Sequence, residues 1–331
     1  MLRGHDKQRR LLKNAVLANR VAHAYLFSGP RAIGKRLVAM EFAAQLNCTQ
    51  SQDGPCGECR DCNNIASGAH QNLFVVTPTD KDGKPDPDGL IRIGQAREVL
   101  AAVRLRIERG KKVVIIDGAH RLKVEAANAL LKTLEEPPPD SVIVLVTEKP
   151  SELLQTILSR CQRLNFTPLD NGAVARHLVE LGAVDRGAAG VMARLSEGSI
   201  GRALSYVDSD LLDERASVIR AFSSLRAGEF DLALKLADSL SKHADLIEML
   251  EFLKIWVRDA AVASYGAGGL VVNSDLAPGM AANADVFSLY DAYRAIDAAI
   301  TDILPPRYAN KLLTLEALFL RLARLGPSKA A

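Results

Sequence analysis

The residues most able to do chemistry lie in a glycine-rich stretch at 29–36, GPRAIGKR, directly after an apolar run. Gly29, Gly34 and Lys35 fill the fixed positions of the pattern G-x-x-x-x-G-K-[ST]. In that pattern, backbone N–H groups and a helix N-terminus surround a phosphate group, which the lysine also contacts. The last position holds Arg36, which has no hydroxyl to offer a magnesium ion. The stretch predicts a phosphate-binding loop and leaves open whether nucleotide still binds there.

Asp117 is a second candidate, because it follows the apolar run Val113–Ile116. A carboxylate at the end of a buried strand can hold magnesium directly or through water. It can equally well cap the helix that follows. A hydrolysing site of this kind usually needs a glutamate next to the aspartate, and Gly118 stands there. Arg36 and Gly118 together predict that this chain is not an efficient ATPase by itself.

Four cysteines within fifteen residues, Cys48, Cys56, Cys59 and Cys62, form the clearest metal signal. Four thiolates suit tetrahedral zinc at about 2.3 Å, and a closed set of this kind is structural. Free thiols are the alternative, since a cytoplasmic protein does not favour disulfides. The fifth cysteine, Cys161, lies far along the chain and is expected to be a buried small residue.

Two further arginines could contact phosphate. Arg160 follows Ser159 after a predicted strand and short helix, so it can extend out of its own domain toward a neighbour's nucleotide. Taken alone, it is more typical of a surface or ion-pair arginine. Arg202 begins a helix in the sequence GSIGRAL, where it can approach a phosphate across a domain cleft or cap its own helix.

The composition of the chain limits the classes of protein to which it can belong. The chain has 331 residues, 48% hydrophobic and 24% charged, which indicates an ordinary globular protein of two or three domains. A net charge of +3 and 5% aromatic residues give little support for a surface that stacks exposed bases. The N-terminus lacks the apolar segment of a signal peptide, and no apolar run approaches the roughly 20 residues of a membrane span. We expect a soluble, cytoplasmic protein. We do not expect polymerase activity, because the sequence shows no set of metal-binding carboxylates arranged for nucleotidyl transfer.

The first half of the chain alternates apolar strands with helices, which predicts a doubly wound parallel α/β sheet. The predicted strands are Ala24–Phe27, Leu73–Val76, Val113–Ile116 and Val142–Val146. The predicted helices are 6–20, 37–46, 94–107, 123–135 and 151–158, and residues 48–62 are predicted to form a loop.

The second half is predicted to be helical throughout. Its longer helices are expected near 211–224, 229–242, 245–264, 284–302 and 307–324, with a loop at 266–279. The predicted domains are an α/β domain at 1–167, a small helical lid at 168–207 and a C-terminal helical domain at 208–331.

Several of these features occur together in a known family. The sequence HAYLFSGP at 23–30, the cysteine knuckle, ANALLKTLEEPP at 127–138 and Ser-Arg-Cys at 159–161 resemble the bacterial clamp-loader subunits of the AAA+ class. Among these, the chain is most similar to the delta prime type of DNA polymerase III. The resemblance covers residues 4–207 well and is weaker beyond them.

The resemblance implies a subunit of a hetero-pentamer that uses ATP to open a sliding clamp and place it on primed DNA. Its partners would be motor subunits and a delta-type subunit, with the C-terminal helices forming a collar. Arg160, next to Ser159, would be the arginine finger given to a neighbouring motor subunit. Thr147 and Arg202 would be the sensor positions of a degenerate ATP or ADP site. The mismatches at Arg36 and Gly118 favour this type over a motor subunit.

Two other functions remain open from the sequence. The first is an active AAA+ motor ATPase of the clamp-loader or helicase type. The second is a zinc-bearing DNA-binding adaptor, suggested only by the basic stretch RLRIERGKK at 104–112. A charge run of that kind is more typical of a solvated helix face and turn.

Overall fold

The computed structural model describes residues 4–51, 53–104, 107, 109–207, 210–225, 227–276, 286–304 and 307–325. The chain divides into two compact units. The first comprises Met1–His177 with Gly198–Arg202, and the second comprises Leu178–Glu197 with Ala203–Ala331. The predicted lid at 168–207 is thus shared between the two units. The three-domain division stays a prediction.

The first unit contains a five-stranded, all-parallel sheet in the order β2-β3-β4-β1-β5. Its central strands are fully buried apolar runs, as parallel strands covered on both faces must be. This confirms the predicted α/β fold class. The strands are β1 (Ala24–Ser28), β2 (Leu73–Val76), β3 (Lys112–Asp117), β4 (Ser141–Thr147) and β5 (Gln162–Asn165).

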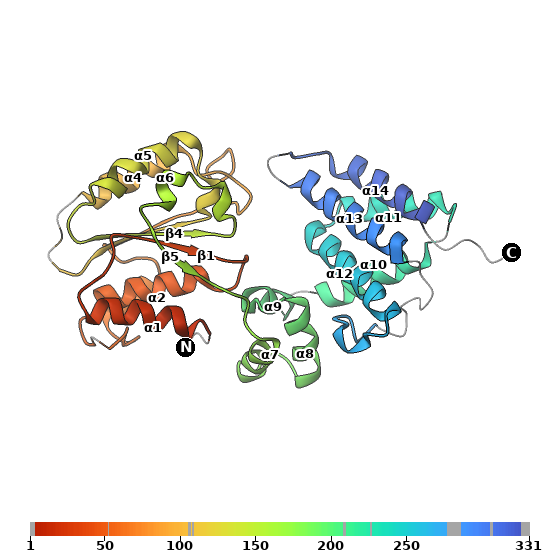
Figure 1. Cartoon of the computed structure of the whole chain (residues 1–331), viewed down its shortest axis with the longest axis horizontal. Helices are drawn as coiled ribbons and strands as arrows, with labels where there is room; N and C mark the ends of the chain where they lie inside the picture. The colour runs from red at the N-terminus through yellow and green to blue at the C-terminus, as the bar shows by residue number, and fades with distance from the viewer. Residues whose placement is uncertain are drawn as a thin grey trace. The chain divides into compact units, whose positions relative to one another are not determined.

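Helices cover both faces of the sheet (Figure 1). Alternate residues of β1 point to opposite faces, so Tyr25 and Phe27 join one core cluster while Ala24 and Leu26 join the other. The first cluster packs against α1 (Asp6–Leu17), α2 (Lys35–Asn47) and α3 (Arg60–Ala66). The second packs against α4 (Ile93–Val103), α5 (Val124–Glu135) and α6 (Gln155–Leu158).

Three local predictions differ from the structure. The predicted helix 151–158 is a 3₁₀ turn, η2 (Pro150–Glu152), followed by the one-turn helix α6, because Leu153 has an extended backbone and is buried between them. The predicted loop at 48–62 already contains the start of α3, whose N-cap is Cys59. Strand β5 was not predicted, since only one of its four residues is buried. A second 3₁₀ turn, η1 (Ala119–Arg121), follows β3.

After β5, the described elements of the chain are all helices, as predicted. Within the second unit, α11 packs against α14 and α12 packs against α13. The helices are α7 (Asn171–Glu180), α8 (Arg186–Leu195), α9 (Ile200–Val207), α10 (Leu211–Ser224), α11 (Phe230–Ser241), α12 (Leu246–Ser264), η3 (Gly268–Leu270), α13 (Val286–Ile303) and α14 (Lys311–Leu325). Part of the predicted loop 266–279 and the start of the predicted helix 284–302 lie outside the described residues. Of the helices that the structure describes, none is both long and apolar enough to cross a bilayer.

Candidate functional site

A cavity of about 560 Å³ opens at the carboxyl ends of β1, β3 and β4, where ligands bind in open α/β sheets. The structure brings six of the predicted residues to this edge. Gly29 follows β1 directly, and the cavity is lined by Gly34, Lys35, Arg36, Asp117 and Thr147 among others. Arg202 is not among its lining residues.

The glycine loop has the backbone that its sequence predicts. A side chain at Gly29, whose φ is 152°, would place Cβ 2.3 Å from the carbonyl oxygen of Phe166, so only glycine fits. Gly34 takes a left-handed conformation with φ 97° and forms the N-cap of α2. The ring of His5, the N-cap residue of α1, contacts this loop, and its Nε2 lies 2.6 Å from the carbonyl oxygen of Ile33.

Lys35 is only 6% exposed, and its ammonium group is bound by its own loop. Nζ donates hydrogen bonds to the carbonyl oxygens of Gly29 at 2.8 Å and Pro30 at 2.5 Å. Burial lowers the pKa of Lys35 to about 8, although Glu148 and Asp117 oppose this shift. The lysine therefore carries its charge at neutral pH and loses it in mildly alkaline solution.

Arg36 and Asp117 form an ion pair, with Nη1 of the arginine 3.6 Å from Oδ2 of the aspartate. Burial raises the pKa of Asp117, and the charge of Arg36 acts against this shift. The N-cap alternative for Asp117 is wrong, because Gly118 forms the N-cap of η1 and no side chain caps that turn.

These residues do not fit a magnesium site of the usual phosphate-loop type. Arg36 supplies a cation where that site needs a hydroxyl, and its guanidinium faces the aspartate that would bind the metal. Gly118 has φ 77°, and a Cβ there would lie 2.9 Å from Cγ of Pro78. A glutamate at this position would therefore be strained as well as crowded.

Sequence reasoning missed His120 and Glu148, which line the cavity beside Thr147. Thr147 is buried, and its hydroxyl lies 3.3 Å from Nδ1 of His120 while accepting a hydrogen bond from the N–H of Lys149. Nε2 of His120 lies 3.5 Å from Glu148, and this contact holds the pKa of Glu148 below its usual value. The only sequence signal for His120 and Glu148 was that they lie close to Asp117 and Thr147 along the chain.

The stretch at 198–202 packs on the glycine loop. The hydroxyl of Ser199 donates a hydrogen bond of 2.7 Å to the carbonyl oxygen of Ala32 and accepts one from the N–H of Arg202. A Cβ at Gly201 would lie 3.0 Å from the same carbonyl oxygen. The structure thus places Arg202 near the loop through its backbone, and the sensor role of its side chain stays a prediction.

Arg160 lies at the opposite edge of the sheet, because it stands two residues before the start of β5 and so at the amino ends of the parallel strands. Its Nη2 pairs with Oε1 of Glu135 at 2.7 Å, and Nη1 donates to the carbonyl oxygen of Thr156 at 2.9 Å. The neighbouring Ser159 hydroxyl donates to the same carbonyl. The side chain of Arg160 remains 34% exposed.

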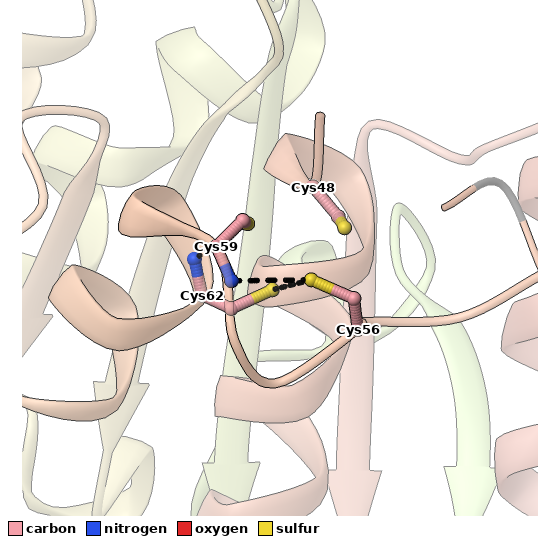
Figure 2. Close-up of side chains that lie close together, drawn as sticks. All are labelled: Cys48, Cys56, Cys59 and Cys62. Carbon is pink, nitrogen blue, oxygen red and sulfur yellow. Dashed lines mark hydrogen bonds between the residues drawn. The ribbon is translucent and has the colours of Figure 1, made fainter. Parts of the chain in front are cut away.

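The four clustered cysteines lie close together, with all sulfur atoms within 4.8 Å of one another (Figure 2). Cys48 forms the C-cap of α2 and Cys59 the N-cap of α3. The sulfur of Cys59 accepts a hydrogen bond from the N–H of Cys62, which helps lower the pKa of Cys59 to about 6. This donor set can hold a metal ion. Cys161 lies outside the cluster and is buried, as predicted.

The basic stretch 104–112 is only partly described, since residues 105, 106 and 108 lie outside the described residues. Arg109 pairs with Asp61 at 3.1 Å and Lys111 with Asp140 at 3.3 Å. Lys112 is 3% exposed and donates to the carbonyl oxygen of Ala102. These engaged side chains give the DNA-binding adaptor no support.

Comparison with solved structures supports the fold. A DNA polymerase III gamma-subunit-related protein of Thermotoga maritima aligns over 97% of this chain and 99% of its own, with a TM-score of 0.51 and 18% identity. At that identity the similarity concerns the fold alone.

Comparison with curated sequences is more specific. The DNA polymerase III subunit delta' of Pseudomonas aeruginosa is 38% identical over 62% of this chain, and the subunit tau of Bacillus subtilis is 31% identical over 74% of it. The chain spans 61% and 45% of these two relatives. The model of the family described as "DNA polymerase III, delta subunit" matches residues 4–170, half of the sequence, so the chain belongs to that family.

Proposed function

We propose that this chain is a delta prime-like subunit of a bacterial clamp loader, which helps place a sliding clamp on primed DNA during replication. The observation that carries the proposal is the ion pair between Arg36 and Asp117, which would take the place of the magnesium side of an ATP site. A subunit with such a site contributes structure, and not its own hydrolysis. The similarity to a delta' subunit supports the same assignment.

Arg160 is the residue through which the chain would contribute to catalysis. An arginine finger stabilises the charge that develops on a transferred phosphoryl group in a neighbouring subunit. The position at the sheet's amino edge and the one-third exposed side chain support this role. Ser159 would help to position it, since both side chains bind the carbonyl oxygen of Thr156.

The cysteine cluster is proposed to hold structural zinc. Four sulfurs with no open position are typical of a site that shapes a loop, and the cluster joins the end of α2 to the start of α3. Two of the four, Cys59 and Cys62, are buried in the same core cluster as α2. Zinc would therefore stabilise that face of the α/β unit.

The partners follow from this assignment. We propose motor subunits and a delta-type subunit in a hetero-pentamer, with the sliding clamp and primed DNA as the targets of the complex. The C-terminal helices α10–α14 would provide the collar contacts, and the protein would act in the cytoplasm.

Reconstitution tests this proposal. The purified chain is mixed with candidate motor subunits, a delta-type subunit and the clamp, and complex formation is followed by size-exclusion chromatography. We expect a stable complex whose ATPase activity is stimulated by clamp and primed DNA. A chain that joins no such complex would contradict the assignment.

The alternative of an active motor ATPase is favoured by one observation, the similarity to a tau subunit over 74% of the chain. Turnover of ATP by the isolated chain distinguishes the two. A delta prime-like chain gives only background hydrolysis, whereas a motor subunit turns over ATP, and its turnover is lost in the Lys35→Ala variant.

A further inference from the structure

We propose that the cavity at the carboxyl edge binds a nucleoside diphosphate without a divalent cation, with the guanidinium of Arg36 standing in the place of magnesium beside Asp117. The inference deepens the proposed degenerate nucleotide site and rests on it. It assigns that site a ligand and a metal requirement.

The cavity retains the parts that hold phosphate. Its volume of about 560 Å³ lies within the range of small-molecule sites. The glycine loop keeps the backbone of a phosphate cradle, with Gly34 leading into the N-terminus of α2. Three cationic side chains, Arg31, Lys35 and Arg36, line the same space. The groups that would bind phosphate are therefore retained, whereas the position that would bind magnesium, beside Arg36 and Asp117, is altered.

The metal side is altered by the Arg36–Asp117 pair. Magnesium requires oxygen ligands in near-octahedral geometry, and in phosphate loops a hydroxyl and an aspartate provide them. Here the hydroxyl is replaced and the aspartate already faces a guanidinium at 3.6 Å. A magnesium ion bound to a nucleotide would meet this positive charge at close range, so magnesium should weaken binding instead of strengthening it.

The carboxylates of the cavity select a diphosphate over a triphosphate. Magnesium normally bridges the second and third phosphates on the side of the strand-end aspartate. Asp117 and Glu148 line the cavity here, and contact with His120 keeps the pKa of Glu148 low, so it is ionised at neutral pH. A third phosphate without its metal would bring negative charge toward these two carboxylates. A diphosphate can bind to Lys35 and to the backbone N–H groups of the loop without approaching these carboxylates.

The test uses the full-length isolated chain and ADP as the probe, with affinity measured by calorimetry in EDTA and in excess magnesium chloride. We expect binding in EDTA, weakened roughly tenfold by magnesium, a coupling of the size common between linked sites. In Arg36→Thr, which restores the hydroxyl, magnesium should strengthen binding, so the sign of the effect reverses. Arg36→Ser serves as a second variant if the first is unstable.

Arg307→Thr is the matched control, because Arg307 is an exposed arginine paired with Asp302 in the other unit. It should retain the wild-type response to magnesium. Stronger wild-type binding with magnesium, no binding of ADP in either condition, or an unchanged sign in Arg36→Thr would overturn the proposal. ATP binding in EDTA as tight as that of ADP would overturn the choice of a diphosphate. None of these results depends on assembly of a loader, so failure here is separable from failure of the proposed function.

Discussion

The two edges of the parallel sheet each carry an arginine–carboxylate pair, and the two pairs differ in what surrounds them. Arg36 and Asp117 line the cavity at the carboxyl edge, 3.6 Å apart, with the arginine 49% and the aspartate 30% exposed. Arg160 and Glu135 meet at the amino edge, 2.7 Å apart, with the arginine 34% and the glutamate 51% exposed. Under the proposed function, the first pair would occupy a metal position, and the second would position an arginine for a neighbouring subunit.

The difference is energetic as well as spatial. A solvent-exposed ion pair contributes about 0–1 kcal/mol, so an approaching phosphate can take Arg160 from Glu135 at little cost. In the Arg36–Asp117 pair, the carboxylate is the more buried partner, and burial raises the pKa of Asp117, so its charge is less favourable without the arginine. Since Asp117 is the less exposed of the two carboxylates, we infer that losing its arginine costs Asp117 more than losing Arg160 costs Glu135.

Removing metal from the cysteine cluster should give the largest change in stability, and should act on one face of the sheet. If zinc is bound at a thousandfold excess over its Kd, its removal lowers the free energy of unfolding by about 4 kcal/mol. Cys59→Ser should act similarly. Amide exchange should accelerate first in α2 and α3, which share the core cluster of the cysteines, and later in α5, which carries Glu135.

Cys161→Ser is the matched control, because Cys161 is buried but lies in the other core cluster. Its stability should still depend on the metal, whereas that of Cys59→Ser should not respond to a chelator. Equal acceleration of exchange in α2 and α5 after chelation would show that the two faces are not separable.

The pH dependence of ADP binding tests whether the charge of Lys35 contributes to binding in the cavity at the carboxyl edge. The pKa of Lys35 is about 8, so the side chain is charged below that pH and neutral above it. ADP affinity should fall roughly tenfold between about pH 7 and about pH 9 as the proton is lost. Lys35→Ala should bind weakly at both values. A wild-type affinity that rises across this range would contradict the role of the lysine.

Loss of the surface carboxylate should have the smallest effect. Glu135→Gln removes an exposed ion pair, so the free energy of unfolding should change by less than about 1 kcal/mol, as urea unfolding would measure. Loader assembly should be unaffected. A stability loss of several kcal/mol would mean that this pair is structural and that Arg160 is not available to a partner.

The sequence predicted the sheet well where local signals were strong. The apolar runs of β1, β3 and β4 and the glycine loop are each visible within a few residues. Strand β5 carries a single buried residue, Leu164, and so has no apolar pattern to detect. The predicted helix at 151–158 failed for a related reason, because Leu153 is buried by tertiary packing from an extended backbone.

The candidate sites, too, could be predicted only where the signal was local in sequence. Arg36 and Gly118 were recognised as departures from a pattern, but their consequences depend on contacts between distant residues. The pairing of Arg36 with Asp117 spans eighty-one positions, and the bond from Ser199 to Ala32 spans 167. Only the assembled sheet brings such residues together. The pairing of Arg160 with Glu135 likewise needs both α5 and β5 in place.

The most direct test compares Arg160→Ala with Lys35→Ala in the reconstituted loader, measuring ATPase activity stimulated by clamp and primed DNA. An arginine finger contributes on the order of 10³-fold or more to turnover at the site it serves. We predict that Arg160→Ala assembles normally and sharply lowers the stimulated ATPase, while Lys35→Ala leaves it nearly unchanged. Unchanged activity in Arg160→Ala, or a large loss in Lys35→Ala, would contradict the account.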